Sequence, residues 1–345
     1  MRPFRRNLPL VALLSTGIVL LAAADAPRPE SFASAAASKP DVTIVVTDSG
    51  LGGLSVAADL AARLPKSGIV RSARIVFVNA EPDAKWGYND LKNDADKVRI
   101  FDGFLSAMEK RYRPDLVLIA CNTLSTVWPR TAHAKAGGVE TVEIVGLGAD
   151  LIRKELAAKP EATALVFATK TTIESGAHKG LLVTSGVAPD RVVGESCPKL
   201  AGAIERGVES PETAGYVKSF VEEALAKRER KDGPLVVSLN CTHYPYVKPL
   251  WERTFAAEGY PGVTILDPNP LMTDVVLAEG GSKRFPRTKV TVEAVSRIPI
   301  DEATRKNLGA LLRATSPETA DALEHIHHDP SLFPVRVDPA AITPR

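Results

Sequence analysis

Two cysteine segments carry the residue types best suited to chemistry in this chain. Residues 114–129 (PDLVLIACNTLSTVWP) and residues 234–249 (PLVVSLNCTHYPYVKP) match at one constant offset, so that Cys121 stands opposite Cys241 and prolines coincide at both ends. Each segment has an apolar strand, then the cysteine, then a polar pair, then the start of a helix. A thiol at such a helix N-terminus is expected to have a lowered pKa, because the helix dipole favours the thiolate. The pattern therefore predicts two reactive thiols.

The pairing of the thiols indicates what they could do. A single cysteine after an apolar strand is usually a buried structural thiol. Two matched thiols on opposite sides of one carbon atom could instead remove a proton from one face and return a proton to the other. The Asn and Thr side chains beside them could bind a carboxylate or an ammonium group. Proton transfer at one carbon is the favoured hypothesis, and two structural thiols are the alternative.

A glycine-rich turn precedes both cysteine segments. Residues 48–53 (DSGLGG) follow an apolar strand and open a helix, where glycine permits tight turning and close approach of the backbone. The Lys-Ser/Thr pair of a P-loop is missing, and so is the Gly-x-Gly-x-x-Gly spacing of a dinucleotide site. Asp48 is consequently either a functional carboxylate or only the N-cap of the helix that follows.

Short apolar runs alternate with longer amphipathic runs along the chain, which is typical of parallel α/β sheets. We therefore predict two pseudo-symmetric parallel-sheet α/β domains, residues 41–145 with 246–314 and residues 146–245. Ligands bind at the carboxyl ends of strands in open α/β sheets, so the active site is expected in the cleft between the domains. The strands are expected at residues 42–47, 75–79, 116–120, 141–145, 164–168, 192–193, 235–239, 263–266 and 290–295.

The composition limits the classes of function. With 43 basic and 41 acidic side chains among 345 residues, nothing suggests a nucleic-acid partner. Three cysteines, an odd number, argue against a disulfide framework and leave at least one thiol free. The histidines within residues 325–328 lack matching metal ligands. Residues 315–345 are therefore expected to form a polar, solvated C-terminal tail without a metal.

The N-terminus has the order of a secretory signal. Residues 1–26 contain three arginines, an apolar run and a small-x-small site that ends at Ala26. The apolar run is shorter than the ~20 residues of a membrane-spanning helix, and an uncleaved anchor is the alternative. Cleavage would leave residues 27–40 as a disordered spacer. The chain is expected to be exported to the periplasm, with no membrane segment after cleavage and with the Sec and twin-arginine routes both open.

Three segments together resemble the signature segments of a known family. TDSGLGGLSV, IACNTLSTVWP and NCTHYPYVKP are similar to those of glutamate racemase and the wider aspartate/glutamate racemase superfamily, over roughly residues 41–310. The resemblance implies a two-domain α/β fold and the interconversion of amino-acid enantiomers without a cofactor or metal. It implies a free amino acid as the small-molecule partner and leaves a homodimer as an option.

The resemblance also implies roles for individual residues. Cys121 and Cys241 match the acid/base thiols, with Asp48 tuning the first thiol, His243 assisting the second, and Glu205 as an acidic partner of the second. The residues implied to hold substrate are Ser49, Trp86, Gly87, Asn122, Thr123, Thr169, Thr172 and Thr242. The remaining cysteine, Cys197, lies in a Cys-Pro pair that is not catalytic in the family.

The chain departs from the family in one loop and in its export signal. Lys85 and Trp86 stand where the family has Pro-Tyr, and Ala80 stands where it has an acidic residue. A Lys85 ammonium that pointed inward would favour an anionic side chain, whereas at the cleft rim it would be solvated. Tyr88 could supply a substitute hydroxyl. These departures predict a substrate preference other than strict glutamate.

Alternatives from other classes stay open at this point. A hydantoin racemase-type enzyme or a decarboxylase would belong to the same superfamily, although a decarboxylase needs only one proton donor. An exported amino-acid-binding protein would keep the cleft yet need neither thiol.

Overall fold

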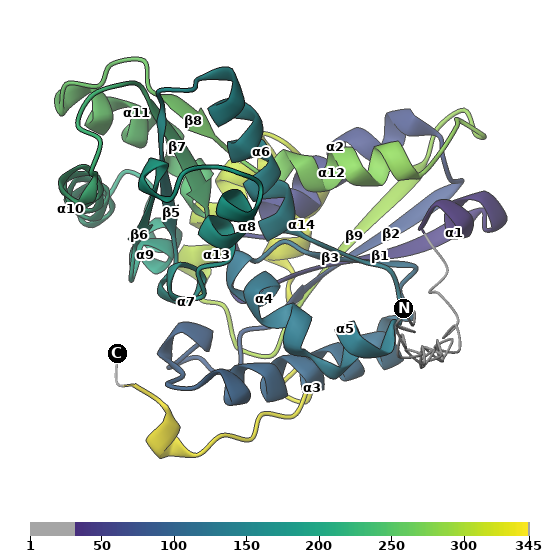
Figure 1. Ribbon diagram of the computed structural model, residues 1–345. Coiled ribbons are helices and arrows are strands. Elements are labelled where there is room, and N and C mark those ends of the chain that lie inside the picture. Colours follow the sequence, from purple (N-terminus) through teal and green to yellow (C-terminus); the bar gives the residue numbers. More distant parts are fainter. Residues whose placement is uncertain (1–31, 344–345) are drawn as a thin grey trace, which may run out of the picture.

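Two parallel β-sheets with helices on both faces make up the fold (Figure 1). The computed structural model describes residues 32–343. In spatial order, the first sheet contains β10 (His327–His328), β9 (Lys289–Ser296), β2 (Ser72–Asn79), β1 (Asp41–Asp48), β3 (Leu116–Ile119) and β4 (Thr141–Glu143). The second contains β6 (Val192–Ser196), β5 (Thr163–Ala168), β7 (Leu235–Asn240) and β8 (Thr264–Leu266).

The two sheets share one strand order, which confirms the predicted pseudo-symmetry. The order β2-β1-β3-β4 in the first sheet corresponds to β6-β5-β7-β8 in the second, and all of these neighbours pair in parallel. The strands that precede the two cysteines, β3 and β7, therefore occupy equivalent places. Beyond β2, the first sheet alone is extended by β9 and β10.

Near-continuous apolar sequence builds the central strands. Every residue of β3, β5 and β7 is buried, as expected for parallel strands that helices cover on both faces. Each sheet accordingly has a hydrophobic core on either face. This packing fixes the strand ends rigidly, so the loops that follow them can position side chains.

The helices connect these strands and cover the sheets. Several begin at a side-chain cap; Asn93, for example, accepts the Asp96 N–H at the start of α3. The α-helices are α1 (Phe32–Ser38), α2 (Leu54–Ser67), α3 (Asp94–Tyr112), α4 (Asn122–Val127), α5 (Ala132–Ala136), α6 (Ile144–Ala158), α7 (Lys170–Glu174), α8 (Ala177–Thr184), α9 (Leu200–Arg206), α10 (Pro211–Lys227), α11 (Lys248–Ala257), α12 (Asn269–Glu279), α13 (Glu302–Arg313) and α14 (Pro317–Glu324).

The predicted return to the first domain at residue 246 is wrong. α11 packs against α10, and β8 pairs with β7, so the second domain continues to residue 266. The chain then returns to the first domain through α12, which packs against α2. The strand at β8 could be predicted from its apolar run, but the sheet it joins depends on contacts that are distant in sequence.

The predicted disordered spacer is also partly wrong. Its residues 32–38 form α1, and Phe32 and Ala36 are buried in the core that covers one face of the first sheet. Arg284 fixes this helix by donating hydrogen bonds to the carbonyl oxygens of Ala36, Ala37 and Lys39. The predicted signal sequence at residues 1–26 lies outside the described residues.

The C-terminal residues are part of the fold rather than a solvated tail. α14 packs against α13 and β9, and β10, whose two histidine side chains are exposed, pairs with β9. Leu332 and Phe333 are buried against α3, where Phe333 meets Phe104 edge to face. The few apolar residues of this polar segment thus hold it against the first domain. Within residues 32–343, no helix is both long and apolar enough to cross a bilayer.

Candidate active site

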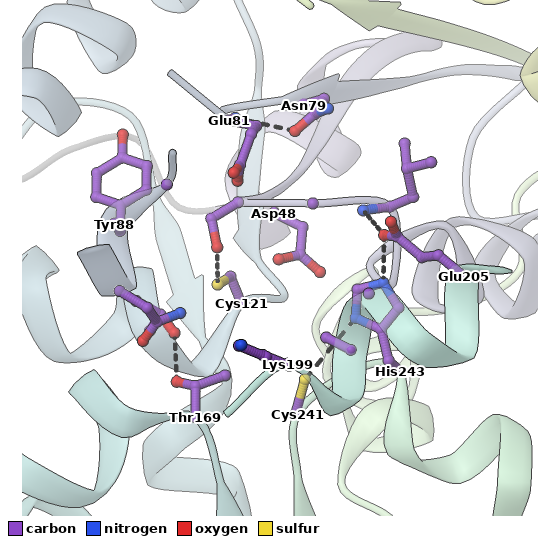
Figure 2. Close-up of a pocket in the computed structure, with 18 of the residues that line it drawn as sticks. Asp48, Asn79, Glu81, Tyr88, Cys121, Thr169, Lys199, Glu205, Cys241 and His243 are labelled. Carbon is purple, nitrogen blue, oxygen red and sulfur yellow. Dashed lines mark hydrogen bonds and ion pairs between the residues drawn. The ribbon is translucent and has the colours of Figure 1, made fainter. Parts of the chain in front are cut away.

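The carboxyl ends of β1, β3, β5 and β7 face one cavity of about 760 Å³ between the domains (Figure 2). This is where open α/β sheets bind ligands, and the structure brings both matched thiols to the same wall. The predicted site residues that line the cavity are Asp48, Ser49, Gly87, Cys121, Asn122, Thr123, Thr169, Glu205, Cys241, Thr242 and His243.

Cys121 follows β3 and caps α4. The Leu124 N–H donates to Cys121 Sγ over 3.4 Å, and Ser49 Oγ lies 3.1 Å from the same sulfur. Burial, and to a smaller extent the nearby Asp48 carboxylate, nevertheless raise the pKa of Cys121 well above the ordinary thiol value. The prediction that the helix dipole lowers this pKa is therefore wrong, because desolvation and a like charge outweigh a helix of 6 residues.

Cys241 follows β7 and has an imidazole partner. His243 Nδ1 lies 3.8 Å from Cys241 Sγ, and His243 Nε2 lies 2.7 Å from Glu205 Oε1. Burial by itself lowers the pKa of His243, but the hydrogen bonds with Cys241 and Glu205 outweigh it and raise this pKa well above the ordinary histidine value. Glu205 Oε1 also accepts the Leu51 N–H over 3.3 Å, which ties it to the glycine-rich turn. The arrangement can carry a proton to and from the second thiol.

Hydrogen bonds across the cavity hold the two domains together at the site. Thr242 Oγ1, beside the second thiol, donates to Asp48 Oδ2 of the first domain over 2.7 Å. The hydroxyls of Thr123 and Thr169, from opposite domains, lie 2.7 Å apart. Side chains from both halves of the molecule thus meet in the cavity wall that contains the two thiols.

Asn122 supplies the polar groups that are free to bind a ligand. Its side chain is buried, and neither its Nδ2 nor its Oδ1 makes a hydrogen bond with a residue of the described chain. Buried amides are almost always hydrogen-bonded, so a bound molecule is the expected partner. Thr172 has a different position from the one predicted. It lies outside the cavity wall and supports Thr169 by a 3.0 Å hydroxyl contact.

Known proteins share both the sequence and the fold. The glutamate racemase of Stutzerimonas stutzeri is 31% identical over 215 residues, which cover 60% of this chain and 72% of that relative. The glutamate racemase of Cereibacter sphaeroides is 31% identical over 238 residues, which cover 65% of this chain and 79% of the relative. The chain belongs to the glutamate racemase family. It is an amino-acid racemase, an isomerase, although no family model matches it.

Solved structures agree with the fold of this racemase. A glutamate racemase from Francisella tularensis, crystallised with D-glutamate, superposes with a TM-score of 0.61 at 19% identity and covers 80% of this chain and 95% of its own. The RacE1 isoform from Bacillus anthracis superposes with a TM-score of 0.62, also at 19% identity, and with the same coverage of the two chains.

In the loop after β2, Lys85 and Trp86 have positions that differ from those expected for residues that contact substrate. Gly87 and Tyr88 line the cavity, whereas Trp86 does not and packs against the core beneath α3. Lys85 is exposed and also lies outside the wall. The predicted contact of Trp86 with substrate is therefore corrected, because its large ring finds apolar partners in the core. Tyr88 is buried, and its hydroxyl has no hydrogen-bond partner within residues 32–343.

Several residues of the cavity wall were not predicted from the sequence. Glu81 and Asp83 come from the loop after β2, Lys199 precedes α9, residues 298–301 connect β9 to α13, and Thr304 lies in the first turn of α13. The sequence features closest to these residues are a Cys-Pro pair and a turn after a strand. Neither feature predicts that the side chains face the cavity. Within the described residues, no group of His, Cys, Asp or Glu side chains could hold a metal ion.

Gly52→Ala should disable the site without disturbing the rest of the fold. A Cβ at Gly52 would collide with Thr242 Oγ1 and lie 2.6 Å from His243 Nδ1. Displacement of these two groups by about 1 Å should lower kcat/KM by ~10²-fold. Gly180→Ala is the matched control, since a Cβ there meets nothing within 4 Å. Wild-type kcat/KM in Gly52→Ala, measured beside its melting temperature, would contradict this geometry.

Proposed function

We propose that this racemase inverts a free α-amino acid through its two cysteines, with the Cα atom held between Cys121 Sγ and Cys241 Sγ. The observation that carries the proposal is the pair of buried, free thiols at equivalent strand ends of two pseudo-symmetric sheets, in the wall of one cavity. Each thiol has its own polar partner, Ser49 for the first and His243 for the second.

The reaction consists of two proton transfers. A thiolate on one side takes the Cα proton, so that the C–H bond breaks, an S–H bond forms, and the electron pair moves into the substrate carboxylate. The thiol on the other side then gives its proton to Cα from the opposite face. The raised pKa of Cys121 makes it the proton donor in the resting protein. Cys241 is the thiol assigned to start as the base, because His243 Nδ1 lies 3.8 Å from its Sγ and can accept its proton.

The charge that develops on the substrate carboxylate needs hydrogen-bond donors that are already in place. Asn122 offers a buried amide without a protein partner, and the hydroxyls of Thr123 and Thr169 lie beside it in the cavity wall. Donors fixed in this way stabilise the charge without reorganising during the reaction. Asp48 and Ser49, on the opposite domain from Thr169, are placed to receive the substrate ammonium group.

A hydrogen-exchange experiment in D₂O tests this proposal. The mature protein is incubated with single L- and D-amino acids, glutamate and aspartate first, because the relatives are glutamate racemases. We expect deuterium at Cα together with the opposite enantiomer, detected by NMR and chiral chromatography. Binding of amino acids without any exchange would instead indicate a binding protein and would refute the racemase mechanism.

Export to the periplasm, after cleavage near Ala26, is a further part of this proposal. Its support is the order of basic residues, apolar run and small-x-small site in residues 1–26. A periplasmic racemase would supply D-amino acids outside the cytoplasm, where the cell wall is built. Fractionation and N-terminal sequencing test this. Mature protein that retains Met1 in the cytosol would refute it. Size-exclusion chromatography with light scattering would show whether it forms a homodimer.

A further inference from the structure

Lys199 has a backbone conformation that is rare for its residue type. It precedes α9 with φ 66° and ψ −12°, in the left-handed region. Among the described residues other than glycine, only Arg113 also has a positive φ, and it ends α3, where this conformation is common. Left-handed backbone is unfavourable for a residue with a Cβ, and such positions cluster at functional sites.

Lys199 is exposed to solvent and is one of the residues that line the active-site cavity. Figure 2 shows its ammonium group directed toward the space between Cys121 and Cys241. Within residues 32–343, no hydrogen bond or ion pair joins this ammonium group to another residue. The other long cationic side chains of the wall are turned toward carboxylates instead. Lys170 lies 3.9 Å from Glu174, and Arg206 lies 2.7 Å from Glu212.

The other charges of the cavity wall would oppose binding of an anionic side chain, so the binding of such a substrate depends on the Lys199 ammonium group. Asp48, Glu81 and Asp83 all line the wall and would repel a second carboxylate on the substrate. His243, which also lines the wall, already has Glu205 as its partner. Lys199 is therefore the cation that remains to offset the charge of an acidic side chain.

We propose that Lys199 Nζ binds the side-chain carboxylate of a dicarboxylic amino acid and so sets the substrate preference of this racemase. The inference rests on the proposed function, because it places Cα between the two thiols. In the open cavity the Lys199 charge is screened by water. When substrate fills the cavity and excludes that water, a charge-assisted hydrogen bond forms that the neutral amide of glutamine or asparagine cannot match.

The test compares substrates that differ only in side-chain charge. For the wild type we expect kcat/KM for glutamate or aspartate to exceed that for glutamine or asparagine by ~10-fold or more. Lys199→Met should abolish this preference by lowering kcat/KM for the dicarboxylic substrate ~10- to 100-fold. It should leave kcat/KM for the amides within about threefold. Met also has a Cβ, so the backbone strain is matched.

Three further variants separate charge from structure. Lys199→Arg should retain most of the preference, whereas Lys199→Gly, which relieves the left-handed strain, should lose the preference without losing stability. Lys85→Met is the matched control, since Lys85 is exposed and outside the cavity wall. Its preference should equal that of the wild type.

The outcomes distinguish this inference from the proposed function. Racemisation of amides as fast as of dicarboxylic acids, or an unchanged preference in Lys199→Met, would overturn the role of Lys199 and leave the two-thiol mechanism standing. Loss of activity on all substrates in Lys199→Met and Lys199→Gly alike would also overturn it, because Lys199 would then be structural. Absence of Cα exchange on every amino acid would overturn the proposed function, and this inference with it.

Discussion

Cys121→Ala and Cys241→Ala will each lower kcat/KM for racemisation by ~10²- to 10⁴-fold, the usual contribution of one acid or base. Each thiol serves one face of Cα, so the second thiol cannot replace the first. Racemisation should be followed in both directions, from the L- and from the D-enantiomer, because either direction needs both groups. Near-UV circular dichroism will show whether each variant keeps the native packing.

Cys197→Ala is the matched control for the two thiols. Cys197 is buried like the others and also lies in the cavity wall, but its Sγ donates to the Glu195 carbonyl oxygen over 3.7 Å, and it has neither an imidazole partner nor a place at a matched strand end. Most activity should therefore survive in this variant. A rate above one tenth of the wild type in either Cys121→Ala or Cys241→Ala would contradict the two-thiol mechanism.

His243→Gln will lower kcat/KM by about 10²-fold, since it removes the group that exchanges a proton with Cys241. Glu205→Gln will keep the imidazole but remove the carboxylate 2.7 Å from its Nε2. That carboxylate contributes to the raised pKa of His243. The limb of the pH profile that reports protonated His243 should consequently move to lower pH in Glu205→Gln.

NMR provides a direct measurement of this titration. The chain has 6 histidines, so the His243 signal can be assigned as the one that His243→Gln lacks. The raised pKa of His243 also determines how the free energy of unfolding changes with pH. Between the ordinary histidine pKa and the raised value, the folded state binds a proton that the unfolded state does not. This contribution to the free energy of unfolding is complete below the ordinary pKa and is lost as pH rises through the raised pKa.

Glu205→Gln should reduce that pH-dependent contribution, which denaturant titrations at several pH values would measure. Arg206, next in the chain, offers a control, because its guanidinium pairs with Glu212. Arg206→Gln should leave the His243 titration in place. An unchanged His243 pKa in Glu205→Gln would show that Glu205 only positions the ring.

The sequence by itself determined the parts of this racemase that local patterns encode. Apolar runs predicted the strands, since parallel strands are buried on both faces. The match between the segments around Cys121 and Cys241 predicted two similar domains and one shared cleft. Those residues sit at strand ends whose position follows from the fold, so a linear pattern was sufficient to place them together.

Tertiary structure alone decided how the cavity is charged and bounded. β8 joins the second sheet, and Phe333 anchors the C-terminal segment, because each finds partners that are distant in sequence. Burial and Asp48 reverse the expected direction of the Cys121 pKa, since desolvation depends on everything packed around the sulfur. Lys85 was the cation suspected from the sequence, but it lies outside the cavity wall, and Lys199, whose backbone before α9 is left-handed, lines the cavity instead. A backbone angle of that kind leaves no periodic signal in the sequence.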